Sequence, residues 1–163
     1  MESAKEQFLK VWEKEYQTTM KVLKSFPENR QDYKPHEISK SAKELAWTIA
    51  GEERTMFVGA ANGNFDWSTM VKAPETMKEV LSTYEHIHKE SVQIVKNTSD
   101  ESLKEDMKFY IAAKTMGDFK KMDLLWMFLM DQIHHRGQFS VYLRLVGAKV
   151  PSIYGPTADE KWD

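Results

Sequence analysis

The stretch DFKKMDLLWMFLMDQIHHRGQFSVYLRLVG, residues 118–147, holds the longest helical pattern in the chain. Its middle, residues 124–130, is apolar at every position, so a helix here has no face that suits solvent. Gly147 is the residue type that commonly follows a helix C-terminus. These features predict a helix over residues 118–146. It is either the most buried helix of a bundle or packs partly against a second subunit.

Three further segments place apolar residues at helical spacing, over residues 3–26, 40–61 and 74–97. The first two start with a serine and a glutamate at capping-box spacing, Ser3 with Glu6 and Ser41 with Glu44. Residues 98–117 contain apolar side chains without a clear period. Helix after helix with no strand pattern between predicts an all-α four-helix bundle in a single domain, residues 1–163.

The composition excludes several classes of protein. A net charge of −2 gives no overall field that would attract nucleic acid or anionic lipid. The absence of cysteine excludes disulfides and thiolate metal sites, and it suits a reducing cytoplasm. The longest apolar run, residues 124–130, is too short to cross a bilayer, and the N-terminal sequence has no signal-peptide pattern. We therefore expect a cytoplasmic protein that binds neither nucleic acid nor membrane.

One constellation of residues could carry chemistry. Asp131 and His135 are four residues apart, which on a helix places both on one face, where they can share a metal ion. A third ligand must come from another helix, and Thr48 or Glu52 on the second predicted helix could supply it. We expect these four side chains to line one pocket. The alternative is that Asp131 and His135 form a local ion pair and that Thr48 is a core residue.

Other polar residues near this constellation are weaker candidates. His134 could act as a proton acceptor at the same pocket. Arg136 could steer an anionic substrate or form a structural ion pair. The remaining histidines are expected at solvated positions: His36, His86 and His88.

Two segments resemble the DinB family: DQIHHRGQFSVYLRLVGAKVPSIYGPTAD, residues 131–159, and KPHEISKSAKELAWTIAGEER, residues 34–54. The HHRGQ and YLR pieces are the most specific parts, and with the helix order the similarity covers most of the chain. The resemblance implies a four-helix bundle, often dimeric, in which three histidines bind a divalent metal. Position by position, these histidines fall on Thr48, Asp131 and His135, so two of the three ligands have changed.

The resemblance also implies a choice between two functions. Some relatives are metal-dependent transferases that act with low-molecular-weight thiols such as bacillithiol or mycothiol. One hypothesis is therefore a metal-dependent enzyme with zinc, nickel or manganese at an altered site, which transfers a small thiol or hydrolyses a small molecule. The alternative is a non-catalytic homodimer that has lost its metal and binds a small ligand or serves in a stress response. Asp131 and His135 favour the first hypothesis, and Thr48 favours the second.

Overall fold

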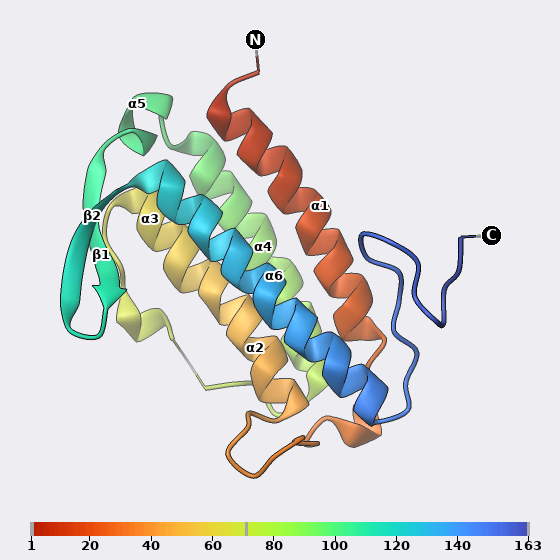
Figure 1. Ribbon diagram of the computed structural model, residues 1–163. Coiled ribbons are helices and arrows are strands. Elements are labelled where there is room, and N and C mark those ends of the chain that lie inside the picture. Colours follow the sequence, from red (N-terminus) through yellow and green to blue (C-terminus); the bar gives the residue numbers. More distant parts are fainter. Residues whose placement is uncertain (1, 71, 163) are drawn as a thin grey trace.

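The computed structural model describes residues 2–70 and 72–162, so Met1, Val71 and Asp163 of the predicted domain lie outside the described residues. Four long helical stretches lie side by side, and each matches a predicted helix with ends that differ by at most three residues (Figure 1). They are α1 (Ala4–Lys24), α2 (Ala42–Glu52) continued by η2 (Glu53–Phe57) and α3 (Val58–Asn62), α4 (Met77–Asn97), and α6 (Lys121–Leu145). Three short helices complete the helical part: η1 (Glu28–Arg30), η3 (Trp67–Thr69) and α5 (Asp100–Leu103).

The order of the helices departs from a simple up-and-down arrangement. The link after α3 runs back along the bundle, so α4 points in the same direction as α2 (Figure 1). Both predicted capping boxes are present, and α4 has a third, in which Thr76 and Glu79 each bond the other's backbone N–H. These caps satisfy N–H groups that have no partner within a helix, which fixes where three of the long helices begin.

The bundle contains two apolar clusters with polar residues between them. In one cluster Trp12 stacks on Phe57, with ring centroids 4.6 Å apart. The other surrounds Ile49 and Phe139. Buried polar side chains occur in each long helical stretch between the residues of the two clusters: Glu15, Glu53, His88, Gln132 and Arg136. The candidate site described below lies at the level of this polar layer.

A small sheet corrects the strictly all-α prediction. Residues 98–117, whose period was unclear, contain α5 and most of an antiparallel hairpin of β1 (Asp106–Ala112) and β2 (Thr115–Lys120). The helix predicted from residue 118 accordingly begins at Lys121. The hairpin lies against one end of the bundle, beside α3 and α6 (Figure 1). The fold is mostly helical with this one two-stranded addition in the described ranges.

The hairpin also covers part of the apolar run in α6. Phe109 of β1 packs edge-on against Phe128, with ring centroids 5.1 Å apart, and Phe8 of α1 packs in the same way against Trp126 at 5.2 Å. Of the residues in the run, Met130 alone is exposed. No helix in the described part of the chain is long and apolar enough to cross a membrane.

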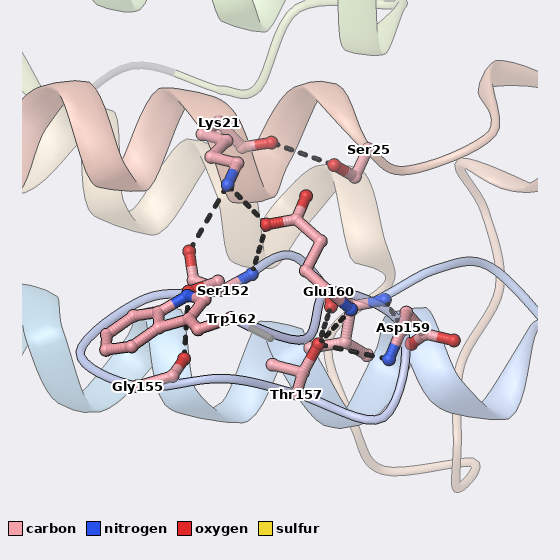
Figure 2. Close-up of polar contacts among 9 residues, drawn as sticks. Lys21, Ser25, Ser152, Gly155, Thr157, Asp159, Glu160 and Trp162 are labelled. Carbon is pink, nitrogen blue, oxygen red and sulfur yellow. Dashed lines mark hydrogen bonds and ion pairs between the residues drawn. The ribbon is translucent and has the colours of Figure 1, made fainter.

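The C-terminal segment packs onto α1 and α6. Val150 and Ile153 join the cluster around Ile49. Figure 2 shows the polar contacts of this segment: Lys21 Nζ of α1 reaches both the Ser152 carbonyl and Glu160 Oε2, the latter at 2.7 Å. The irregular tail is thus tied to the bundle by both apolar and polar contacts.

Candidate metal centre

The candidate site is formed where α2 and α6 pack together. Glu52 is the last residue of α2, and Asp131 and His135 lie one turn apart on α6. Between them in the sequence, Gln132 is buried and its Nε2 donates a 2.9 Å hydrogen bond to the Ile49 carbonyl. Ile49 lies about one turn before Glu52. This bond therefore helps to set the distance between α2 and α6 at the point where the side chains of Glu52, Asp131 and His135 meet.

The three side chains converge. His135 Nε2 lies 3.2 Å from Glu52 Oε1 and 3.7 Å from Asp131 Oδ2, and one ligand atom from each residue lies within 4.8 Å of the others. On the far side of the ring, His135 Nδ1 lies 2.9 Å from Gln138 Oε1, which accepts its hydrogen. A metal-binding histidine commonly has such a partner, because the bond holds the other nitrogen toward the ion.

Glu52 shows whether these residues suit a metal ion. Its Oε2 is buried and has no hydrogen-bond partner in the part of the chain that the structure describes. Burying a polar atom without a partner costs about 1–3 kcal/mol, so such atoms are rare. Carboxylate and imidazole groups are ligands for zinc, manganese and nickel. The unpartnered oxygen and the donor set therefore fit a divalent ion between α2 and α6.

The electrostatics of Glu52 and His135 are coupled. Burial raises the pKa of Glu52 above its ordinary value. The hydrogen bond to Glu52 raises the pKa of His135 to about 9, so its ring is protonated at neutral pH. The proton on Nε2 lies on the side of the ring that faces both carboxylates, where a metal ion would bind. A proton and a metal ion therefore compete for this nitrogen.

Exposure differs across the three residues. The side chains of Glu52 and His135 are 14% and 20% exposed, whereas that of Asp131 is 54% exposed. An ion held here has protein on the Glu52 side and water on the Asp131 side. Catalytic metal sites keep a position open to water or substrate, whereas structural sites are closed.

A buried polar network holds the helix directly after Glu52. Glu53 has no exposed surface, and its carboxylate accepts hydrogen bonds from Trp12 Nε1 at 3.0 Å, Tyr84 OH at 3.1 Å and His88 Nδ1 at 2.9 Å. It is the first residue of η2, a π-helical turn. Such turns occur frequently at functional sites. Glu53 thus anchors α1 and α4 to the segment that ends in Glu52.

The prediction that His88 is solvated is wrong. Its side chain is 3% exposed, it stacks on Tyr16 with ring centroids 3.7 Å apart, and its Nε2 lies 3.1 Å from Glu13 Oε2. Burial disfavours the charged ring, but the hydrogen bonds to Glu53 and Glu13 outweigh burial and raise the pKa of His88. His36 and His86 are exposed, as expected.

Comparison with known proteins agrees with the resemblance seen in the sequence. The model of the DinB family matches residues 1–162. The chain belongs to the DinB family. The uncharacterised protein YrdA of Bacillus subtilis strain 168 is 30% identical to it in an alignment of 162 positions that covers 95% of this chain and 90% of YrdA.

Two solved DinB-like structures have the same fold. One, from Bacillus cereus ATCC 10987, superposes with a TM-score of 0.76 over 90% of this chain and 95% of its own at 21% identity. The other, YjoA from Bacillus subtilis, gives 0.75 over 90% and 97%, also at 21% identity. At this identity the likeness establishes a DinB-like fold and leaves the chemistry to the site itself.

The altered DinB-type ligand positions have different surroundings. Thr48, which the sequence resemblance aligns with the family's second-helix histidine, donates a 3.0 Å hydrogen bond from its hydroxyl to the Glu44 carbonyl and contacts the Lys40 ammonium. The group of carboxylate and imidazole side chains that converges on His135 has Glu52 as its third member. The sequence named both residues as possible third ligands, and the geometry favours Glu52.

The two further pocket candidates lie on different sides of α6. His134 is exposed and lines a cavity of about 500 Å³ together with Glu52 and Asp131. Arg136 is 1% exposed and forms a 2.7 Å ion pair with Glu15 inside the bundle. The expectation that Arg136 lines the pocket is therefore wrong, and its structural alternative, a buried ion pair, is what the structure contains.

Three cavities surround the centre, and no single one holds all four predicted residues. Thr48 and Glu52 line the one beside α2, about 590 Å³ in volume. Glu52 and Asp131 line the one beneath the hairpin, and His135 lines a third of about 510 Å³. The carboxylates and the imidazole thus lie where separate cavities meet, so groups approaching from different sides can reach them.

Proposed function

We propose that this chain is a metal-dependent enzyme of the DinB family that acts on a small molecule, by transfer of a low-molecular-weight thiol or by hydrolysis. The observation that carries the proposal is the unpartnered, buried Glu52 Oε2 beside Asp131 and His135. Three ligands with one side open to water are what a catalytic divalent ion requires.

Each residue has a distinct role in this proposal. Glu52, Asp131 and His135 hold the ion, which is zinc, nickel or manganese, and Gln138 orients the His135 ring through Nδ1. A bound ion supplies a Lewis acid that lowers the pKa of a thiol or water. His134 is exposed on the wall of the cavity that Glu52 and Asp131 share, where it can accept the proton that such a nucleophile releases.

The setting belongs to the same proposal. A cytoplasmic location suits it, because small thiols stay reduced there. The family resemblance suggests bacillithiol or mycothiol as the type of thiol and a homodimer as the assembly. These elements rest on the sequence and the resemblance.

A second function is favoured by a different observation. The Glu52–His135 ion pair and the two hydroxyl contacts of Thr48 satisfy most of the polar groups here without any ion. The alternative proposal is a bundle that has lost its metal and binds a small ligand or takes part in a stress response. The two proposals differ in one measurable property, the affinity for divalent metal.

The test is calorimetric titration of the full chain, purified without a His-tag, with zinc, nickel and manganese. We expect one ion per chain, and we expect Glu52→Gln and His135→Ala each to weaken binding more than about tenfold, a loss found even when a residue that only orients a ligand is removed. Thr48→His should change affinity little if Glu52 is the third ligand. A large gain in that variant, with Glu52→Gln unaffected, would assign the third position to residue 48.

A matched control is available on α4. His86 and Glu90 form an exposed histidine–carboxylate pair at the same helical spacing, with His86 Nε2 3.2 Å from Glu90 Oε1. His86→Ala should leave metal affinity unchanged. If neither wild type nor Thr48→His binds metal while circular dichroism shows an intact fold, the enzyme proposal fails and the non-catalytic one stands.

A further inference from the structure

Gly51 of α2 is unexplained by packing. The helix continues from α2 through η2 and α3 to Asn62, so Gly51 is an interior position, where glycine destabilises a helix relative to alanine. At Gly59, farther along, a close neighbour explains the glycine, because an added Cβ would lie 2.4 Å from Phe65 Cδ1. At Gly51 an added Cβ would meet no atom of residues 2–70 or 72–162 within 4 Å. The glycine leaves space that no side chain in the described ranges fills.

That space is part of the cavity beside α2. Its volume, about 590 Å³, is within the usual range for small-molecule sites. Trp47 lies one turn before Gly51 on the same helix and Met56 lies beyond it, while Met70 contributes from the loop. Without a side chain at Gly51, a flat apolar group can approach the helix backbone between these side chains. Trp47, Met56 and Met70 suit an aromatic ring.

Three lysines and three glutamates line the cavity: Lys40, Lys43, Lys72, Glu44, Glu52 and Glu75. Lys43 pairs with Asp32 and Lys72 with Glu75, which leaves Lys40 as the lysine available to a ligand. Its ammonium contacts the Thr48 hydroxyl, and in the described ranges no carboxylate lies within ion-pair distance of it. Lys40 attracts Glu52 at longer range, but the Glu52 carboxylate is already paired with His135. Lys40 also borders the cavity that His135 lines, so this cation is positioned between the apolar cavity and the candidate metal centre.

We propose that this cavity binds a small aromatic anion, with its ring over Gly51 beside Trp47 and its negative group at Lys40. The inference deepens the proposed function, on which it rests for the role of the ligand as a substrate, because Glu52 belongs to both sites. Binding itself requires no metal. The cavity selects by shape through Gly51 and by charge through Lys40.

The test uses fluorescence of 8-anilinonaphthalene-1-sulfonate, an aromatic anion, with the full chain in the presence of EDTA. Its uncharged analogue, N-phenyl-1-naphthylamine, has the same rings without the sulfonate. We expect saturable binding of one sulfonate probe per chain and about tenfold weaker binding of the neutral probe, since the neutral probe cannot accept a hydrogen bond from the Lys40 ammonium. Lys40→Met should remove most of the difference between the probes.

Two glycine variants test the position of the ring. Gly51→Leu fills the space beside the helix and should weaken sulfonate binding at least about tenfold. The matched control is Gly137→Leu on α6, where an added Cβ also meets no atom within 4 Å and which does not line this cavity. That variant should bind the probe as wild type does. Circular dichroism and thermal melting establish that both variants are folded.

The inference is overturned if Gly51→Leu binds the sulfonate probe as tightly as wild type, or if the neutral probe binds equally well. The results also distinguish failure of this inference from failure of the metal proposal. Expected probe binding without any metal affinity supports the cavity and contradicts the metal-dependent function. Metal affinity without saturable probe binding supports the metal-dependent function and contradicts the proposed cavity ligand.

Discussion

Glu52 and Glu53 are neighbours in the sequence with opposite surroundings. Glu53 accepts three hydrogen bonds inside the core, whereas Glu52 keeps one oxygen without a partner and faces His135. A buried carboxylate that is fully hydrogen-bonded stabilises the fold, while one with an unused oxygen is available to a ligand. The number of hydrogen-bond partners of the carboxylate distinguishes the structural Glu53 from the functional Glu52 more clearly than their burial does.

The protonation of His135 gives a prediction at the residue scale. NMR titration of the metal-free chain should show a His135 pKa of about 9, and Glu52→Gln should lower it toward the ordinary value of about 6.5, because the main hydrogen bond to the charged ring is lost. The raised pKa contributes to stability below pH 6.5, and this contribution disappears as the pH rises through about 9. A His135 pKa near 6.5 in wild type would contradict this account.

The sequence allowed part of the site to be predicted at this scale. Asp131 and His135 follow from helical spacing, but whether Thr48 or Glu52 joins them depends on how α2 is rotated against α6. That rotation is set by the tertiary bond from Gln132 to the Ile49 carbonyl, which no local pattern reveals.

For the residues predicted incorrectly, a signal was present in the sequence. Arg136 lies in a buried stripe with Gln132, Phe139 and Leu143, spaced as one face of a helix. His88 follows Tyr84 and precedes Ser91 and Val95 on the buried face of α4. In both cases charged neighbours in the sequence suggested a solvated position, although the spacing places the residue on the buried face of its helix.

At the scale of the element, two glycines of one continuous helix should respond oppositely to alanine. Gly51→Ala should raise the free energy of unfolding by about 0.5–1 kcal/mol, because the new methyl group meets open space and alanine favours the helix. Gly59→Ala should lower it, because the half-buried Phe65 ring must move to make room for the new methyl group. Urea denaturation of both variants measures this. Equal effects would show that helix propensity alone decides.

The π-turn gives a second comparison within the same helical stretch. Glu53→Gln should lower the free energy of unfolding by about 3 kcal/mol, since it breaks a buried charged pair and leaves His88 poorly compensated. Glu52→Gln should lower it by less, because it breaks a single, partly exposed ion pair with His135 and one Glu52 oxygen has no bond to lose. The measurement is chemical denaturation of both variants at neutral pH. A larger loss in Glu52→Gln would contradict the assigned roles.

The elements themselves were predictable to different degrees. Long amphipathic segments with capping boxes identified the four helical stretches, because burial of one face and the caps act together. The hairpin was not predicted because only Met107 and Phe109 of β1 face the bundle, and this alternation of buried and exposed residues is too short to indicate a strand. Its turn also lacks the usual glycine, since Lys114 adopts the positive φ of 61°. The π-turn has no local sequence signal.

For the whole molecule, the C-terminal segment connects the surface to the polar layer. The Tyr154 hydroxyl bonds both Arg136 and Glu15, with Glu15 Oε2 at 2.7 Å. Arg144 of α6 reaches Asp159 Oδ2 at 2.6 Å. The tail therefore completes the surroundings of a buried ion pair that α1 and α6 share, on the side of α6 away from the candidate centre. The three cavities around the candidate centre are instead lined in part by residues of α2.

The assembly provides the last prediction. The apolar run of α6, residues 124–130, is largely covered within the chain. The argument for a homodimer therefore rests on the apolar side chains near the hairpin that remain exposed. Met130 is 61% exposed and lines the same cavity as Tyr110, which is 51% exposed. Ile111 and Met116, on the two strands, are 59% and 46% exposed. Several large exposed apolar side chains on one hairpin favour an interaction surface there.

We therefore expect light scattering at micromolar concentration to give twice the 19.0 kDa mass of one chain. Replacing Ile111 and Met116 by aspartate should shift the protein to the mass of a single chain, because burying the new carboxylates without partners is costly. The matched control is the same replacement at Ile38, which is 87% exposed in the loop before α2, and this variant should remain dimeric. A wild-type protein that is monomeric under these conditions would contradict the homodimer. Dimers that persist in the hairpin variant would instead place the interface on another face of the bundle.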